Sequence, residues 1–581
     1  MIRKLIKQML AAQTLSALTV SVCLLIDNVM IARFLGVNAV AAYGLANPVL
    51  LVIGAIGSML AAGVQVACSR SLGSGSQEET NKGYSSAIGL TVVISLAFMV
   101  LVFLLRNPLA IMMGAGKEAE LFDQTRDYMM GFIIGAPASM GALILVPFLQ
   151  MAGQSNLLIA AVLGMTVADV GFDLLNVLVF HGGMFGMGLA SSLSYYAAML
   201  IAMGYFLARK CVFTFSLKYI TAAKIKELFV GGIPAVFNMA SSVVLVFILN
   251  KILLAVGGSE AVAAYTVLMS LGNSSNCIST GIGGVSLTLS GILYNEEDRT
   301  GLAELLKLLT RYAVLLGVAV GALILVFAPV LVSIFIPQES AVRDLTILSM
   351  RLYALGLIPC CINNAMKNLY QGTERVTLTE AISILEGALL PATAGFLFSR
   401  FWGVTGVWLF FAAGETLALL CIAMLVWHNH HGFTLNPQPF LMLKKDFGVQ
   451  PENLMEMDIS SVQEVTATAE AAEAFCRKHG QSEKVANHIA LCVEEMASNT
   501  VIHGFAKGKN NHLSIRVQHK GERWVLRFRD DCSAFDPVSY VPKGEDDALG
   551  IRLVMAMADD IRYTYSMNLN NLTIKLAAGK N

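Results

Sequence analysis

Long apolar runs fill the first three quarters of this chain and stop abruptly before its C-terminal part. Residues 1–445 hold 25 Lys and Arg and 21 Asp and Glu, whereas the much shorter segment 446–581 holds 15 and 19. A segment of about 20 mostly apolar residues crosses the hydrocarbon core of a bilayer. We therefore expect a lipid-embedded body followed by a soluble domain.

Twelve apolar runs in the body are long enough to span a membrane. We expect each to be an α-helix, because a backbone in lipid must satisfy its own hydrogen bonds. The expected spans are 14–35, 47–69, 84–105, 128–151, 156–180, 186–208, 228–255, 262–290, 305–334, 346–369, 377–399 and 404–427.

Positive charges gather in alternate connections between these spans. The connections 36–46, 181–186 and 256–261 hold no Lys or Arg, and 106–127 departs from the alternation with three. The charged connections and chain start contain Arg3, Lys4, Lys7, Arg209, Lys210, Lys218, Lys224, Lys226, Arg299, Lys307 and Arg311. By the positive-inside rule, we expect a multi-pass protein of the cytoplasmic (inner) membrane with both termini in the cytosol.

The body contains an internal repeat. GVNAVAAYGLANPVL at 36–50 aligns without a gap on GSEAVAAYTVLMSLG at 258–272, and each copy follows one apolar run and opens the next. Six helices followed by six in the same orientation form a parallel repeat, which in transporters encloses a substrate path. The expected division is an N-terminal six-helix lobe (10–210), a C-terminal six-helix lobe (211–430), a linker (431–452) and a soluble domain (453–581).

The body contains the motifs IDNVMIARFLGVNAVAAYG at 26–44, GIPAVFN at 232–238 and YQGTERV at 370–376, among others. In these motifs it resembles the multidrug and toxic compound extrusion (MATE) family. The resemblance covers residues 10–430. It implies two six-helix lobes around a central cavity and export of amphipathic organic cations, drugs or metabolites, driven by inward Na+ or H+ flow.

Carboxylates inside the expected spans require a partner or a function, because a charge at mid-membrane depth costs roughly 2.5–3.5 kcal/mol. Asp27 lies in the first span, and Asp169, Asp173 and Asn176 share one face of the fifth. The resemblance places a cation site at Asp27 and Asp173, with Asp169 where Asn is more usual and Ser191 supplying a hydroxyl. Hydrogen bonding between helices is the alternative interpretation.

Two further carboxylates, Glu386 and Glu415, lie in the eleventh and twelfth spans. With Asn176 they are candidates to line the substrate cavity and attract organic cations, and local pairing is the alternative. The C-terminal lobe offers Asn238, Asn363 and Asn364 in place of further carboxylates, which argues against a second cation site. Zero net charge gives no sign of a nucleic-acid partner.

Residues 453–581 show the alternation of a compact α/β unit. Strands are expected in LMEMDIS, HLSIRVQ, WVLRFRD and NLTIKL, and helices at 461–479, 483–504 and 549–560. EEMASNTVIHGF, RDDCSAFDP and LGIRLVMAMADDIRY in this order resemble the GHKL ATPase fold and its anti-sigma-factor serine kinase branch. The fold class is thus a polytopic helical membrane body with a cytosolic α/β sandwich domain.

This second resemblance implies roles for individual residues. Asn499 would hold Mg2+, Glu495 would act as the catalytic base, Asp530 would accept from the adenine amino group and Gly550 would admit phosphate. ATP and Mg2+ are the implied cofactors. Cys532 and the Asp547–Ala548 pair stand where the family usually has glycine, which favours nucleotide binding over efficient phosphoryl transfer.

Three functions follow from these observations. The first is a secondary antiporter with a nucleotide-binding regulatory domain. The second is a membrane-tethered serine kinase that acts on a sigma-factor-antagonist-type protein and uses the body as a sensor. The third is a lipid-precursor flippase, which the carboxylates of the first lobe favour less.

Overall fold

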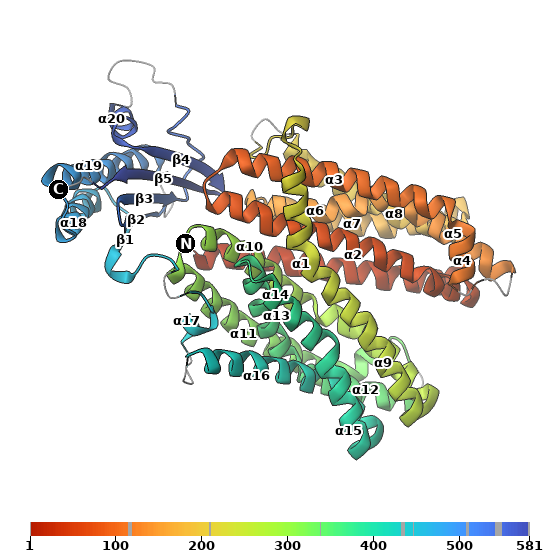
Figure 1. Ribbon diagram of the computed structural model, residues 1–581. Helices are drawn as coiled ribbons and strands as arrows, with labels where there is room; N and C mark the ends of the chain where they lie inside the picture. The colour runs from red at the N-terminus through yellow and green to blue at the C-terminus, as the bar shows by residue number, and fades with distance from the viewer. Residues whose placement is uncertain are drawn as a thin grey trace.

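The computed structural model describes residues 2–113, 115, 119–207, 211–336, 339–430, 436–444, 447–506, 511–540 and 549–578. Helices make up the body, and every strand of the described residues lies beyond Asn453. Figure 1 shows the body as two helical lobes, with the sheet and its helices at one end, next to the N-terminus. We call this the sheet-side end and the opposite one the far end.

The N-terminal lobe consists of helices α1 to α8 and one short π-helix. Their bounds are α1 Ile2–Phe34, α2 Val37–Gly73, α3 Gln77–Leu104, α4 Arg106–Met112, α5 Ala119–Ile133, α6 Ala136–Met151, α7 Ser155–Leu175, η2 Asn176–Phe180 and α8 Gly183–Phe206. A 3-10 turn, η3 Leu217–Tyr219, follows in the connection to the next lobe.

The C-terminal lobe consists of helices α9 to α16. Their bounds are α9 Ala222–Ser275, α10 Cys277–Asn295, α11 Arg299–Ser333, α12 Ala341–Ala354, α13 Leu357–Gly372, α14 Val376–Ile384, η4 Leu385–Leu389, α15 Leu390–Val407 and α16 Phe410–His430. The start of α9 packs against α2, and α10 packs against both α1 and α2. These contacts join the two lobes.

The described residues include nine helices long and apolar enough to cross a membrane, and two bent pairs raise this to eleven. These eleven correspond to the second to twelfth expected spans, and the first lies within α1. The eighth begins later than expected, at Cys277, because the polar stretch before Asn276 ends α9. Apolar side chains point outward, as in Val93 and Val167, which are 65% and 75% exposed.

The backbone repeats the symmetry seen in the sequence. The aligned glycines Gly36 and Gly258 both have positive φ, 90° and 64°, and each ends one helix and begins the next. Only glycine adopts this conformation readily, which explains why the motif begins with it. Each lobe also contains a helix pair bent by 47°, α5 with α6 and α12 with α13. The parallel repeat is therefore visible in local geometry.

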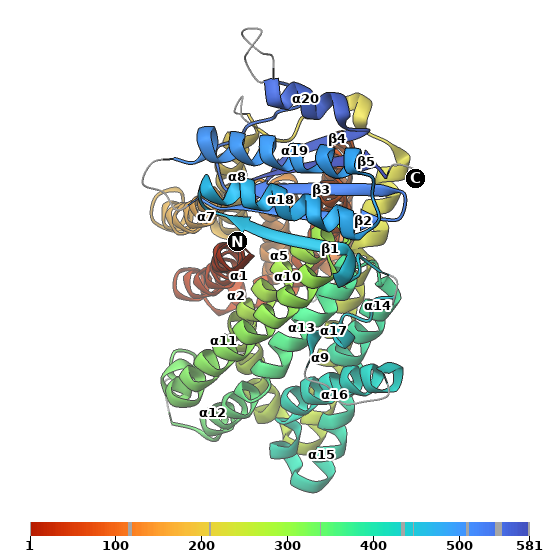
Figure 2. The same cartoon turned by 90° about the vertical axis from the view of Figure 1, so that its left-hand side faces the viewer.

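The C-terminal domain is a five-stranded antiparallel sheet covered on one face by three helices. The strand order is β1-β2-β3-β5-β4, and Figure 2 shows α18, α19 and α20 over the sheet. The bounds are α17 Pro437–Phe440, η5 Pro451–Asn453, β1 Leu454–Ile459, α18 Gln463–Lys478, α19 Glu483–Asn499, η6 Thr500–Gly504, β2 Leu513–Lys520, β3 Arg523–Asp530, α20 Leu549–Met557, β4 Asp560–Ser566 and β5 Leu569–Ala577.

The four strands expected from the sequence are all present, but a fifth was not expected. The prediction of a helix through 560 was wrong at its end, because α20 stops at Met557 and β4 begins at Asp560. The alternation of Ile561, Tyr563 and Tyr565 was the available signal for a strand. A single apolar core, which includes Trp524, fills the space between sheet and helices.

Candidate functional site

The carboxylates of the N-terminal lobe meet inside the helical body. Asp27 of α1 is 4% exposed, and Asp169 and Asp173 of α7 are 2% and 0% exposed. The Ser191 hydroxyl of α8 donates to Asp27 Oδ2 at 3.2 Å. The side chains of Asp27, Asp169 and Asp173 interact electrostatically with one another. The structure therefore brings all four expected residues of the cation site together.

These carboxylates lack the partners that buried charges require. Four of their six oxygens, Asp27 Oδ1, Asp169 Oδ2 and both oxygens of Asp173, have no hydrogen-bond partner among the described residues. No described Lys, Arg or His forms an ion pair with any of the three. A buried carboxylate without a counter-charge is costly unless it binds a proton or a cation. The cluster can thus hold either.

Two residues near this cluster were not singled out in the sequence. The side chain of Ser194 lies beside Asp169, and the fully buried Tyr128 of α5 interacts with Asp27 and Ser191. Ser194 follows Ser191 by three residues, so helical spacing was an available signal. Tyr128 comes from a distant segment, and nothing in the sequence alone joins it to α1.

Asn176 has a structural position rather than an open one. Its Nδ2 donates to the carbonyl of Gly183 at 3.2 Å, and its Oδ1 accepts from the backbone N–H of Gly182 at 3.1 Å. A β-carbon on Gly186 would lie 1.8 Å from Asn176 Oδ1. The Asn176 side chain therefore stabilises the connection between α7 and α8, and both its amide nitrogen and its amide oxygen take part in these hydrogen bonds.

Glu386 and Glu415 lie within the C-terminal lobe and are also partnered. Glu386 is 9% exposed and forms an ion pair with Lys367 of α13, a partner not expected from the sequence. Glu415 is 6% exposed and accepts from Asn363 Nδ2 at 2.8 Å. A lysine inside an apolar run was the missed signal. Lys367 therefore supplies a counter-charge to Glu386, whereas Asn363 supplies Glu415 with a hydrogen bond and no charge.

The expected catalytic residues of the C-terminal domain lie together on α19 and α20. Glu495 and Asn499 are one helical turn apart and half-buried. A β-carbon on Gly550, at the start of α20, would lie 1.8 Å from Glu495 Oε2. Gly550 is thus packed directly on the Glu495 carboxylate. Its lack of a side chain is a steric requirement of this contact.

The donor set on α19 fits a magnesium ion held mainly by a nucleotide. No group of three or more His, Cys, Asp or Glu side chains suited to a metal occurs among the described residues. Mg2+ in nucleotide sites is bound by one or two protein oxygens together with phosphate oxygens and water. The side-chain amide of Asn499 supplies an oxygen of this kind and fits the ion implied by the resemblance.

Asp530 ends β3 and is 7% exposed. Its Oδ1 accepts from Asn570 Nδ2 at 2.7 Å and from the Cys532 backbone N–H at 3.0 Å. Burial raises the pKa of the Asp530 carboxyl above its ordinary range, although these two hydrogen bonds act in the opposite direction. An ordered, partly desolvated carboxyl with one further oxygen is suited to recognising an N–H donor of a ligand.

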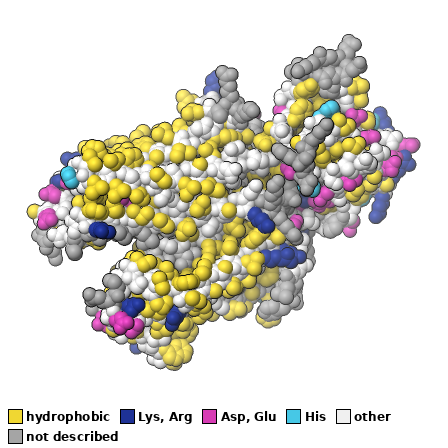
Figure 3. All heavy atoms as spheres, turned by 180° about the vertical axis from the view of Figure 1, so that it is seen from behind, with side chains coloured by type: hydrophobic (Ala, Val, Ile, Leu, Met, Phe, Trp, Pro, Cys, Tyr) yellow, Lys and Arg dark blue, Asp and Glu magenta, His cyan; other side chains and the backbone are white. Residues whose placement is uncertain are grey.

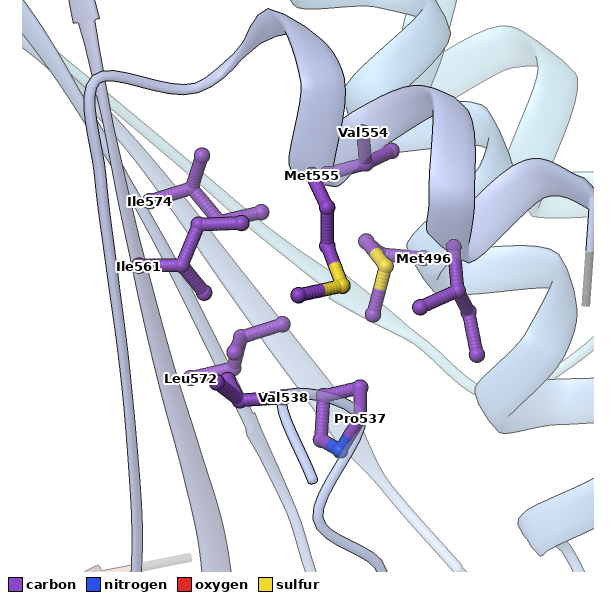
Figure 4. A pocket seen from close by; sticks show the side chains of 9 residues that line it. Met496, Pro537, Val538, Val554, Met555, Ile561, Leu572 and Ile574 are labelled. Atoms are coloured by element: carbon purple, nitrogen blue, oxygen red, sulfur yellow. The ribbon is translucent and has the colours of Figure 1, made fainter. Parts of the chain in front are cut away.

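An apolar pocket lies beside these residues, between α19, α20 and the sheet. Figure 4 shows the side chains of Met496 and Met555 between the helices and strands β4 and β5. The lining is Met496, Pro537, Val538, Ile551, Val554, Met555, Ile561, Leu572 and Ile574. The cavity has a volume of about 10 Å³, and most of its lining belongs to the apolar core of the domain, so it is a small gap in the packing of α20 on the sheet. The Asp547–Ala548 pair lies outside the described residues.

Cys532 occupies a glycine position of the expected pattern and is buried. A β-carbon on Gly504, at the end of η6, would lie 3.1 Å from Cys532 Sγ. Gly504 therefore leaves room for the Cys532 side chain at this contact. The loop after β3 is accommodated without the usual glycine.

Fold and sites together define a multi-pass membrane protein of transporter type that carries an ATPase-like domain. The sequence pattern of the MatE family matches residues 13–179 and 234–392, and the chain belongs to this family. The pattern of the histidine kinase-like ATPase domain matches residues 460–576. Both resemblances expected from the sequence are confirmed.

Relatives and solved structures agree with this assignment. The multidrug export protein MepA of Staphylococcus saprophyticus is 23% identical over 406 residues, which cover 69% of this chain and 88% of MepA. MepA of Staphylococcus aureus is 22% identical over 395 residues, covering 67% and 86%.

Solved structures have the same fold. A crystal structure of MATE in complex with MaL6 has a TM-score of 0.68 and 19% identity, and covers 72% of this chain and 94% of that one. A MOP superfamily transporter from Pyrococcus furiosus also has a TM-score of 0.68 with 19% identity, covering 76% and 97%.

Proposed function

We propose that the protein is a cation-coupled antiporter that exports amphipathic organic cations across the cytoplasmic membrane. The carrying observation is the buried cluster of Asp27, Asp169 and Asp173, which has four unpartnered oxygens and no counter-charge among the described residues. A bound proton or Na+ reduces the negative charge of this cluster by one, and its release restores that charge. The MepA relatives are multidrug export proteins by name, which supports this substrate class.

Coupling follows from the energetic cost of the unneutralised cluster. Buried carboxylates one helical turn apart repel one another, so the lobe has different stable arrangements with and without the ion. An ion gradient then biases the equilibrium between the two arrangements. The ionic partner is a proton or Na+, and both meet the same requirement for a positive charge.

Transport of a fluorescent organic cation by the full chain in proteoliposomes tests this proposal. We expect uptake that depends on an imposed H+ or Na+ gradient, and loss of that dependence in Asp27→Asn and Asp173→Asn. Asp344→Asn is the matched control, because Asp344 is exposed at the start of α12. Transport by both cluster variants at the wild-type rate under the same gradient would contradict the proposal.

The same proposal places both termini and the C-terminal domain in the cytosol. The charged connections around Lys218, Lys224 and Arg299 lie in the turns at the sheet-side end, whereas the turns at Gly36 and Gly258 lie at the far end. This distribution supports the positive-inside assignment. Accessibility of residues in the C-terminal domain to a membrane-impermeant reagent in intact cells is the direct check, and we expect none.

The C-terminal domain is proposed to bind ATP with Mg2+. Asn499 would hold the ion, Asp530 would accept from the adenine amino group, and Gly550 would admit phosphate. The match to the ATPase domain pattern supports this function. Equilibrium binding of a fluorescent ATP analogue to the full chain tests it, with Asp530→Asn expected to weaken binding and exposed Glu483→Gln expected to leave it unchanged.

A second candidate function is phosphorylation of a sigma-factor-antagonist-type protein by the same domain. The contact between Glu495 and Gly550 favours it, because it holds a carboxylate next to the expected phosphate site. Glu495→Gln with Asn499→Ala separates the two functions. Efflux that continues while phosphorylation of a serine-containing target stops would make the kinase the primary activity of the domain.

A further inference from the structure

The uncovered face of the sheet lies against the sheet-side end of both helical lobes. The helices α18 to α20 cover its other face (Figures 1 and 2). The contacts come from strands β2, β3 and β4 and from the turn between β4 and β5. They reach three connections of the body, and these connections belong to different lobes.

The contact with the C-terminal lobe is electrostatic. Arg516 of β2 forms an ion pair with Asp298, and Arg529 of β3 forms one with Glu296. Arg527, which pairs with Arg516 across the strands, donates to the carbonyl of Glu296 at 2.7 Å. The Asp298 side chain is 2% exposed. The connection between α10 and α11 is thus bound by arginines on two adjacent strands.

The Asp298 contact is stable at neutral pH. Burial disfavours its charge, but the Coulomb attraction of Arg516, together with hydrogen bonds from Arg516, Gly301 and Thr300, outweighs burial and lowers the pKa of the Asp298 carboxyl. Asp298 also accepts from the backbone N–H of Gly301 at 2.8 Å and so begins α11. The Asp298 carboxylate therefore caps the start of α11 and also binds the C-terminal domain through Arg516.

The linker attaches the domain to the C-terminal lobe as well. Leu441 is fully buried in the core of that lobe, and the Tyr370 hydroxyl donates to the carbonyl of Phe440 at 2.8 Å. Phe447 stacks on Tyr294 with ring centroids 4.8 Å apart. The chain is therefore held to this lobe as far as Phe447, seven residues before the sheet begins at Leu454.

The contact with the N-terminal lobe is smaller and comes mainly from the turn between β4 and β5. The Met567 backbone N–H donates to the carbonyl of Met151 at 2.7 Å. Asn568 Nδ2 donates to the carbonyl of Gly153 at 2.9 Å. Arg562 of β4 adds a hydrogen bond from Nη1 to the carbonyl of Ser74 at 3.1 Å. All three acceptors are backbone carbonyls at the ends of α2 and α6.

The two lobes are closed together at this same end. Arg70 of α2 forms an ion pair with Glu374 of the other lobe at 3.1 Å, and a β-carbon on Gly73 would lie 2.4 Å from the carbonyl oxygen of Ile292. The space-filling view in Figure 3 is hollowed between the lobes at the far end. The body is therefore closed next to the sheet and open away from it.

We infer that the C-terminal domain is a brace that holds the two lobes closed at the sheet-side end. A rigid sheet bound to both lobes cannot keep both contacts once these ends separate. The linker and the arginines hold it to the C-terminal lobe, so the contact made by Arg562, Met567 and Asn568 is the one that breaks. This inference rests on the proposed function, because only an alternating transporter must open here.

Hydrogen exchange tests the contact itself in the full chain reconstituted in nanodiscs. The Met567 amide is protected only while it donates to Met151. We expect the variant Arg562→Ala with Asn568→Ala to lower protection of this amide about tenfold, since it removes two hydrogen bonds. Arg523→Ala with Asn487→Ala is the matched control, because both residues are exposed on the same domain. Unchanged protection in the first variant would overturn the contact.

The consequence for the lobes is measured by spin labels at Glu78 and Glu304, which are exposed near the sheet-side end of different lobes. Labels attached through a non-natural amino acid leave the native cysteines intact. We expect a longer-distance population to increase in the Arg562→Ala/Asn568→Ala variant and to stay at the wild-type level in the control. Loss of Met567 protection without a change in the distances would overturn the brace. Because neither readout requires substrate, failure of transport remains a separate result.

Discussion

The side chain of Asn570 connects the nucleotide-site carboxylate to the turn that contacts the transporter body. Asn570 Nδ2 lies 2.7 Å from Asp530 Oδ1, and its Oδ1 accepts from the Tyr563 hydroxyl at 2.6 Å. Two residues earlier, Asn568 is bound to Gly153. A short, hydrogen-bonded segment of β5 therefore lies between the candidate adenine site and the helix that follows Gly153, α7, which carries Asp169 and Asp173.

Replacing Asn570 should affect both ends of this segment. Asn570→Ala removes the hydrogen bond to Asp530, and we expect an affinity for a fluorescent ATP analogue lower by about tenfold. In the same variant we expect reduced exchange protection of the Met567 amide. A loss of affinity with full protection would show that the two sites act independently.

The pH dependence of nucleotide binding should report Asp530. Because burial raises the pKa of its carboxyl, the group binds a proton at a pH above the ordinary value of about 4. The charged form is the stronger acceptor, so affinity is present above the raised pKa and is lost as pH falls through it. Binding to wild type and to Asp530→Asn, measured between pH 4.5 and 7.5 at roughly equal intervals, should differ in slope. If the affinities of wild type and Asp530→Asn depend on pH in the same way, the group that titrates belongs to the nucleotide and not to Asp530.

Gly550→Ala should disrupt the nucleotide site through a steric clash. The new β-carbon would lie 1.8 Å from Glu495 Oε2, so either the helix α20 or the carboxylate must move. We expect ATP binding to fall by about tenfold or more, an effect of the size of an overpacked contact. Combining it with Glu495→Ala vacates the space. Recovery of binding without recovery of any hydrolysis would distinguish the steric role of Gly550 from the chemical role of Glu495.

The buried pair of Lys367 and Glu386 should be important for the stability of the C-terminal lobe. Lys367→Met leaves Glu386, which is only 9% exposed, without its counter-charge. We expect destabilisation of about 3 kcal/mol, measured by denaturant unfolding in detergent. The double variant Lys367→Met with Glu386→Gln removes both charges and should recover most of the loss. If the double variant is as unstable as the single one, Lys367 stabilises by packing alone.

Much of the fold could be predicted from the sequence, because the patterns that indicate the helices and strands are local or occur twice along the chain. The lengths of the apolar runs predicted the membrane helices. The repeated glycine, Gly36 in one lobe and Gly258 in the other, marks a turn with positive φ in each lobe. Strand β4 was missed because the motif LGIRLVMAMADDIRY continues from a helix into a strand. No local pattern marks that boundary apart from the alternation of Ile561, Tyr563 and Tyr565.

Parts of the candidate sites could not be predicted from the sequence, because they depend on contacts between segments that are far apart along the chain. Residue spacing placed Asp169 and Asp173 on one helix face, but the position of Tyr128 beside Asp27 arises only from the packing of α5. The pairing of Lys367 with Glu386 joins α13 to η4. The arginines of β2 and β3 read as ordinary surface charges until the sheet is placed against Glu296 and Asp298.

The most direct test of the central claim measures the ion rather than the substrate. Proteoliposomes loaded with an organic cation, with no ion gradient imposed, are diluted while internal pH or internal Na+ is followed. Antiport predicts an inward H+ or Na+ flux that follows substrate efflux in wild type and in Asp344→Asn, and that is absent in Asp27→Asn and Asp173→Asn. Substrate efflux from wild type with no counterflow of either ion would contradict the account.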